Sequence, residues 1–219
     1  MKRSDIHKVY DLLEEAYRNM EEPSVTKISK QTKNDPFRVL VSCLISLRTK
    51  DEVTLESSER LFKIADCPEK MLNLSEAEIG KLIYPAGFYK TKAVTIKNIC
   101  EILVNEYGSK VPDEIDELVK LKGVGRKTAN LLIVEGYRRP AVCVDTHVHR
   151  IFNRLGYVKT KNPDKTEIEL RKHLPENYWI RINEILVAYG RAVCRPVSPF
   201  CSSCTLESLC DKVDVTVRR

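Results

Sequence analysis

One short segment, from Leu121 to Asn130, limits most strongly what this chain can fold into. It reads Leu-Lys-Gly-Val-Gly-Arg-Lys-Thr-Ala-Asn, with apolar residues at helical spacing on both sides. Because glycine allows a left-handed turn and a close approach of a second backbone, Gly123 and Gly125 predict a tight turn between two helices. We expect Val124 to enter the core there. The unpaired N–H groups and the positive dipole end of the second helix suit a phosphate.

Three interpretations of this turn compete. The plain one is a helix–helix turn with a solvated basic rim, which is the commoner case for an isolated Gly-Val-Gly. A nucleotide P-loop is excluded, because Leu118 stands where G-x-x-x-x-G-K-[ST] requires glycine and Val124 stands where it requires lysine. A dinucleotide-binding turn is excluded because no strand precedes the glycines. The plain turn therefore remains, as does the possibility that its helix N-terminus holds a phosphate.

Helix signals recur through the rest of the chain, and strand patterns with hairpin turns are absent. Helix-starting residues precede apolar residues at helical spacing: Ser4, Asp35 with Pro36, Ser75 with Glu78, and Asn162 with Pro163. Gly156 is placed to end a helix. We therefore predict an all-α fold.

Composition sets wide limits only. With 219 residues, 42% of them hydrophobic, the chain can bury one large core or two small ones. The net charge of +6 permits an anionic partner without establishing one. No apolar run approaches the roughly 18 residues of a membrane span, and no secretory signal is visible.

Eight cysteines without a signal peptide indicate a reducing compartment, where clustered cysteines are more often metal ligands than disulfides. Four are scattered and are expected to be small buried residues: Cys43, Cys67, Cys100 and Cys143. The other four have the spacing Cys194-x6-Cys201-x2-Cys204-x5-Cys210. Four thiolates in so compact a loop can hold a [4Fe–4S] cluster or a zinc ion.

Lys127 and Asp145 are the candidate catalytic residues. Lys127 lies in the first turn of the second hairpin helix, where the dipole disfavours a cation, and only a neutral amine can attack carbon. Asp145 precedes a further helix eighteen residues later. An aspartate there is most often only a helix cap, and a lysine is usually solvated. The pattern by itself leaves both interpretations open.

The glycine segment, the Val-Asp-Thr-His stretch at 144–147 and the cysteine spacing together resemble the endonuclease III-like DNA glycosylases of the helix-hairpin-helix superfamily. The resemblance runs from about the first helix to Cys210. It implies that Lys127 and Asp145 form the catalytic pair and that the four clustered cysteines hold a [4Fe–4S] cluster. It also implies a set of DNA-binding residues: Arg48, Phe88, Gly123, Val124, Gly125 and Arg126.

The same resemblance implies two helical lobes. Residues 29–139 would form a six-helix lobe with the hairpin. Residues 140–219, joined by the N-terminal helix within 1–28, would form the iron–sulfur lobe. We expect a monomer that binds double-stranded DNA containing a damaged base or an abasic site, in the cytoplasm and associated with the nucleoid.

The implied function is excision of oxidised pyrimidines in base excision repair, followed by β-elimination at the abasic site through a lysine Schiff base. One alternative is a mismatch or other damaged-base glycosylase of the same fold. A second is a non-catalytic iron–sulfur module that uses the hairpin only to grip phosphate. A pure binder needs neither Lys127 nor Asp145.

The chain departs from the family at two positions that reach into DNA. Arg48 stands where the family usually has glutamine, in the residue that fills the gap left by the flipped base. Phe88 stands in place of an aliphatic wedge, and its alternative interpretation is a partly buried core aromatic. The nearby Lys90, Lys92 and Lys97 are expected either to contact phosphates or to solvate a helix.

Overall fold

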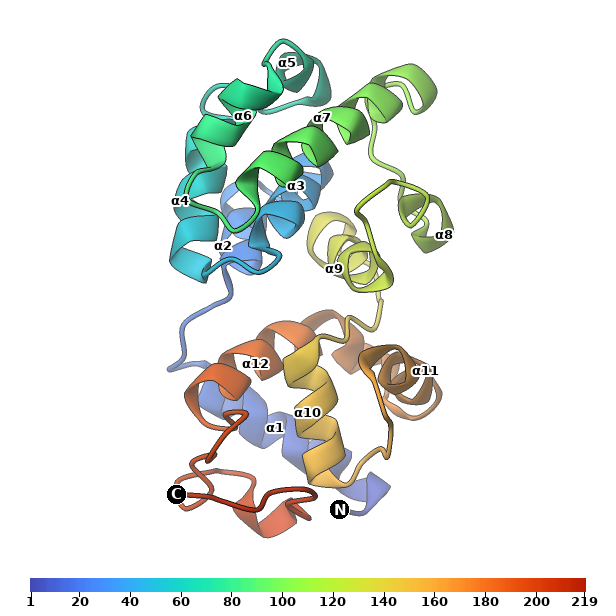
Figure 1. The fold of residues 1–219 in the computed structure, drawn as a ribbon. Coiled ribbons are helices and arrows are strands. Elements are labelled where there is room, and N and C mark those ends of the chain that lie inside the picture. The colour runs from blue at the N-terminus through green and yellow to red at the C-terminus, as the bar shows by residue number, and fades with distance from the viewer. The chain divides into compact units, whose positions relative to one another are not determined.

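The computed structural model describes all 219 residues and contains α-helices and short 3-10 turns, without strands (Figure 1). The all-α prediction is therefore confirmed. Packing divides the chain into two units, one made of residues 1–23 and 142–219 and the other of residues 24–141. The expected boundary after residue 28 falls inside a helix, α2 (Ser24–Gln31), which packs with the second unit.

The second unit contains eight helices, six of which have at least eight residues. After α2 they are α3 (Pro36–Ser46), α4 (Asp51–Phe62), α5 (Pro68–Leu72), α6 (Glu76–Ile83), α7 (Tyr89–Glu106), α8 (Ile115–Leu118) and α9 (Arg126–Tyr137). The central helix is α3, which packs against α2, α4, α7 and α9. Eight of its eleven residues are buried, because neighbours surround it and no polar face is needed.

Three of the predicted helix starts are present. Asp35 Oδ1 accepts a hydrogen bond from the Arg38 amide at 2.8 Å. Ser75 and Glu78 form a reciprocal capping box at the start of α6. Asn162 Oδ1 accepts from the Lys165 amide at 2.9 Å and begins α11 (Pro163–His173). Each cap pairs a backbone donor that the helix itself leaves unpaired.

The prediction that Ser4 caps the first helix is wrong. Ser4 lies inside a 3-10 turn, Arg3–Asp5, and α1 (Ile6–Tyr17) begins after it. The Asp5 carboxylate accepts a hydrogen bond from the Lys2 amide at 3.2 Å, which closes this turn before the helix starts. The prediction for Gly156 is confirmed: it has a φ of +77° and ends α10 (Thr146–Leu155).

The first unit joins the two ends of the chain around one core. It contains α1, α10, α11 and α12 (Trp179–Ala192), followed by the cysteine-rich segment. The helix α1 packs against α12. Apolar side chains of both helices, together with those of α10, belong to one buried cluster. No helix of the structure is long and apolar enough to cross a membrane.

Candidate active site

The predicted glycine hairpin lies between α8 and α9. Gly123 has a φ of +96°, and a Cβ there would lie 2.7 Å from Thr95 Cγ2. Glycine is therefore required at this position by both conformation and packing. Gly125 is the N-cap of α9, and a Cβ there would meet no atom within 4 Å. The backbone at the start of α9 is thus open to an approaching ligand.

Val124, between the two glycines, is 5% exposed and anchors the turn in the core, as predicted. Its amide donates to the Leu121 carbonyl at 2.9 Å. Lys122 and Arg126 on either side are exposed. The hairpin consequently presents cationic side chains around an open helix N-terminus, an arrangement that suits a phosphate.

Lys127 is the second residue of α9 and is half-buried. Because α9 packs against α3, the buried Cys43 lies within electrostatic range of this lysine. Burial raises the pKa of the Cys43 thiol to about 12, against the opposing effect of the Lys127 charge. Cys43 therefore remains a neutral thiol near physiological pH and supplies no counter-charge to the amine.

Asp145 belongs to the other unit and is the N-cap of α10. Its Oδ1 accepts hydrogen bonds from the amides of His147 at 2.8 Å and Val148 at 2.9 Å. Its Oδ2 accepts none from the protein. Asp145 is thus a helix cap, and one of its two carboxylate oxygens is left for a further partner.

The polar side chains that follow Asp145 bind within their own unit. His149 Nδ1 lies 2.7 Å from Thr166 Oγ1, and Asn153 Oδ1 accepts from the Thr160 amide at 2.8 Å. Burial lowers the pKa of His149. These contacts tie α10 to α11 and to the intervening loop, so His149 and Asn153 have a structural role.

The four clustered cysteines line one hollow in the first unit. Three of their sulfurs already have a hydrogen-bonding neighbour: Arg154 Nη1 lies 3.4 Å from Cys194 Sγ, Tyr189 Oη 3.1 Å from Cys204 Sγ, and the Lys212 amide 3.4 Å from Cys210 Sγ. Four cysteine sulfurs around one hollow are a donor set that suits an iron–sulfur cluster or a zinc ion.

Of the four scattered cysteines, Cys43, Cys100 and Cys143 are buried as predicted. Cys67 is only half-buried, and the prediction for it is wrong. Cys67 is the N-cap of α5, a position at the end of a short helix that the surrounding core does not enclose.

Arg48 and Phe88 lie together at the surface of the second unit. Both have left-handed backbones, with φ of +52° and +56°. The Arg48 guanidinium carbon lies 5.6 Å from the centre of the Phe88 ring. Phe88 is 63% exposed, so the interpretation as a core aromatic is wrong. An exposed aromatic ring paired with a guanidinium is free to enter a base stack.

The HhH-GPD superfamily of base excision DNA repair proteins matches residues 41–176 of this chain. The chain is 48% identical over 177 residues to endonuclease III of Thermotoga maritima, with 81% of this chain and 83% of that protein covered. It is 39% identical to endonuclease III homolog 2, chloroplastic, of Arabidopsis thaliana, where the match covers 80% of this chain and 47% of the relative. The chain belongs to the endonuclease III family. It is accordingly a base excision repair enzyme of the DNA glycosylase and AP lyase class.

The chain also shares the fold of this family. A solved structure of a trapped endonuclease III–DNA covalent intermediate aligns with a TM-score of 0.84 and 29% identity, over 97% of each chain. The match extends over both units and the cysteine-rich segment. The family assignment therefore rests on 97% of the chain, and not on the hairpin alone.

Two of the lysines expected at the surface have a different role in this member of the family. Lys92 is 7% exposed and donates to backbone carbonyls, so neither phosphate contact nor solvation describes it. Lys97 is half-buried and donates to the Leu74 carbonyl at 2.8 Å. Lys90 is exposed. Periodicity along α7 does not distinguish these lysines, because the burial of Lys92 depends on a loop far away in sequence.

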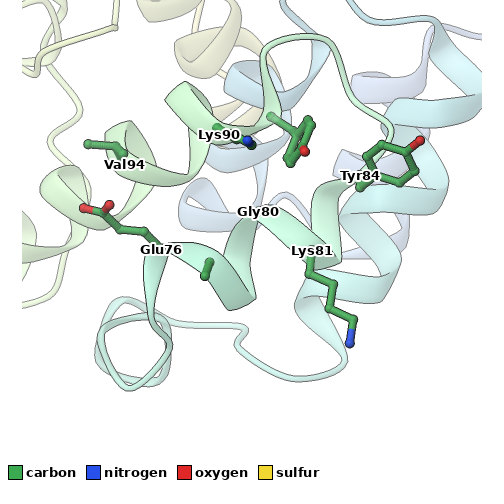
Figure 2. A pocket seen from close by; sticks show the side chains of 8 residues that line it. Glu76, Gly80, Lys81, Tyr84, Lys90 and Val94 are labelled. Carbon is green, nitrogen blue, oxygen red and sulfur yellow. The ribbon is translucent and has the colours of Figure 1, made fainter.

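Lys90 lines a groove of about 540 Å³ between α6 and α7. Figure 2 shows Tyr84 at one end of this groove and Glu76 and Val94 at the other. A Cβ at Gly80 would lie 3.6 Å from the Tyr89 ring, so the groove has an aromatic wall. Lys127, Asp145, Arg48, Phe88 and the hairpin residues do not line it.

Proposed function

We propose that this enzyme excises oxidised pyrimidines from duplex DNA and cleaves the resulting abasic strand through a Schiff base on Lys127. The observation that carries the proposal is the position of Lys127, half-buried in the first turn of α9 directly after an open glycine hairpin. A pure DNA-binding module has no need of an amine at this point. The trapped covalent intermediate among the solved relatives supports a covalent route.

In the proposed reaction the neutral amine of Lys127 forms a bond to C1′ of the damaged nucleoside. The bond between C1′ and the base nitrogen breaks with its electron pair, and the base leaves as an anion that takes a proton from solvent. Asp145 accepts the lysine's proton and stabilises the positive charge that develops at C1′. Since Oδ1 of Asp145 is held by the α10 amides, Oδ2 is the oxygen available for this role.

The sugar ring then opens to give an imine between Lys127 and C1′. Loss of a proton from C2′ expels the 3′ phosphate and breaks the strand 3′ to the lesion. Water finally hydrolyses the imine and restores the amine. C1′ is reached only after the nucleotide leaves the base stack, so the reaction requires base flipping.

The hairpin residues Gly123, Val124, Gly125 and Arg126 are proposed to hold a DNA phosphate. The open backbone at Gly125 allows the phosphate to approach the amides of α9, and Arg126 adds a charge beside them. Binding should weaken strongly as salt rises, because the contacts release counterions from DNA.

We further propose that Cys194, Cys201, Cys204 and Cys210 hold a [4Fe–4S] cluster. The thiols line one hollow, and three of them have neighbouring donors that stabilise a thiolate. Cys194, Cys204 and Cys210 also pack against the core that α1 and α12 share. When bound, the cluster would cross-link the C-terminal segment to this core, and it takes no part in the bond changes above.

Borohydride trapping tests the proposed function. Duplexes carrying thymine glycol, an abasic site or a T·G mismatch are incubated with enzyme and borohydride, which reduces an imine to a stable amine. An adduct mapped to Lys127 on the thymine glycol duplex is the expected result. An adduct on abasic DNA alone would mean that the enzyme is a lyase whose excised base is another lesion. No adduct on any duplex, with DNA binding intact, would contradict the lyase mechanism.

Arg48 bears on the choice between an oxidised pyrimidine and a mismatch substrate. Its exposed guanidinium donates hydrogen bonds only, whereas glutamine both donates and accepts. The substitution Arg48→Gln should therefore change the ranking of the four opposite bases, by on the order of tenfold for guanine, whose O6 and N7 suit an arginine fork. Single-turnover excision against each opposite base measures this ranking. Identical rates for all four bases in both proteins would exclude a role of Arg48 in opposite-base preference.

A further inference from the structure

Lys92 is a buried ammonium whose three donors all have partners. It is 7% exposed, and its Nζ lies 2.6 Å from the Ile45 carbonyl, 2.6 Å from the Leu47 carbonyl and 2.8 Å from Thr49 Oγ1. Every acceptor belongs to the end of α3 or to the segment that follows it. Lys92 itself comes from α7, so this contact joins segments more than forty residues apart.

The carbonyl groups around Lys92 Nζ favour a cation, whereas burial of the side chain opposes one. The carbonyls at the end of α3 are unpaired by the helix and carry its negative dipole end. No carboxylate pairs with the ammonium, and burial lowers the pKa of Lys92 to about 8. A buried charge with only neutral partners is costly to the fold. Its presence is therefore better explained by what it holds in place.

What Lys92 holds is the loop that carries Arg48. Thr49 Oγ1 accepts hydrogen bonds from Lys92 Nζ and from the Gly87 amide at 3.1 Å, and it donates to the Leu47 carbonyl at 3.3 Å. The hydroxyl has no further capacity as a donor. Thr49 thus links the segment 47–50 to the segment 85–88.

The two segments also touch through their backbones. A Cβ at Gly87 would lie 2.4 Å from the Arg48 carbonyl oxygen, so no side chain fits between them. The segments contain Arg48 and Phe88, which both have left-handed backbones and exposed side chains, with the guanidinium over the ring. Arg48, Phe88 and Lys92 border one cavity of about 390 Å³. Lys92 is buried, whereas Arg48 and Phe88 are exposed.

We propose that Lys92 is a positioning residue that holds the Arg48 and Phe88 loops as one rigid unit, so that both side chains enter the DNA duplex together when a nucleotide is extruded. This rests on the proposed function, in which extrusion precedes chemistry. Lys92 would act through Arg48 and Phe88 and would touch neither the lesion nor Lys127.

The test compares two reactions of the intact enzyme. Excision of thymine glycol from a duplex requires a stacked base to be extruded, whereas cleavage of a pre-formed abasic site requires less, because no base is unstacked. Lys92→Met should slow single-turnover excision by on the order of tenfold to a hundredfold, the scale expected when a positioning contact is lost. Lyase activity on the abasic duplex should fall by less than about threefold.

Lys97→Met is the matched control. Lys97 lies on the same helix and also donates to backbone carbonyls, but at the segment after α5, away from Arg48 and Phe88. It should leave the ratio of excision to lyase activity unchanged. Thermal unfolding of both variants separates loss of folding from loss of positioning.

A second pair of variants disturbs the same contact from its other side. Gly87→Ala forces the Arg48 backbone to move while Lys92 remains, and it should reproduce the selective loss of excision. Gly80→Ala, whose Cβ would make an ordinary 3.6 Å contact, should not. This pair keeps the proposal testable if Lys92→Met fails to fold.

A double-mutant cycle measures the coupling between Arg48 and Phe88, which would not change if Lys92 had only a structural role. In the otherwise unaltered enzyme, Arg48→Ala and Phe88→Ala should be non-additive in excision, because the side chains act as a unit. In the Lys92→Met protein, the effects of the same two substitutions on excision should become additive. Equal losses of excision and lyase activity, or unchanged coupling, would overturn the positioning role. A parent enzyme inactive on every duplex would instead overturn the proposed function, and the positioning role with it.

Discussion

Replacing Lys127 by glutamine is expected to abolish strand cleavage and borohydride trapping while DNA affinity changes little. Glutamine keeps much of the side chain's length and polarity but has no lone pair able to form an imine with C1′. Removal of a nucleophile typically costs three or more orders of magnitude, so we expect lyase activity to fall by at least about a thousandfold. Because Lys127 is only half-buried at the start of α9, the fold should tolerate the change.

The measurement is single-turnover cleavage of abasic and thymine glycol duplexes, with affinity for an uncleavable abasic analogue measured alongside. Lys122→Gln is the control, because Lys122 is an exposed lysine of the same hairpin. It should weaken binding modestly and reduce the salt dependence while cleavage of bound DNA continues. Cleavage by Lys127→Gln at the parent rate would exclude this lysine as the nucleophile.

The second large effect concerns the cysteine-rich segment. Cys204→Ser should yield a colourless protein with little iron and a lower Tm. Cys204 packs against the core of the first unit, and its sulfur lies beside Tyr189, so loss of the cluster would release the C-terminal segment from that core. Breaking a native cross-link commonly costs about 2–5 kcal/mol. For a chain of this size that corresponds to roughly 4–20 °C in Tm.

Iron analysis, visible absorption and thermal unfolding of the purified protein measure this effect. Cys67→Ser is the matched control, since Cys67 is the N-cap of α5 and serine is a preferred residue at that position. The control should keep its iron and its Tm. A stable Cys204→Ser protein, or a parent protein that contains zinc and no iron, would overturn the cluster assignment.

Much of the local structure follows from short stretches of sequence. Asp35 with Pro36, Ser75 with Glu78, and Asn162 begin helices as predicted, because each cap is an interaction between residues three apart. Ser4 does not begin a helix, since a competing contact between Lys2 and Asp5, also three residues apart, closes a 3-10 turn first. Local rules succeed where one local interaction dominates and fail where two compete.

Some features of the candidate site likewise follow from local sequence, and others do not. The turn at Gly123 and the burial of Val124 are encoded within ten residues and are present as predicted. The catalytic roles of Lys127 and Asp145 came from the family resemblance and stay predictions. The exposure of Phe88 was undecided in the sequence, because a lone aromatic between helices suits a core as well as a surface.

The sequence by itself determined the helical class, the glycine turn, the helix caps and the four-cysteine spacing, all of which depend on neighbours within a few residues. Only the tertiary structure decided that Lys92 is buried and that Arg48 and Phe88 lie in contact. Both depend on the start of α7 meeting the end of α3. A lysine among lysines on a helix carries no sign of such a partner, because burial and hydrogen bonding across a fold are set by packing and not by spacing along the chain.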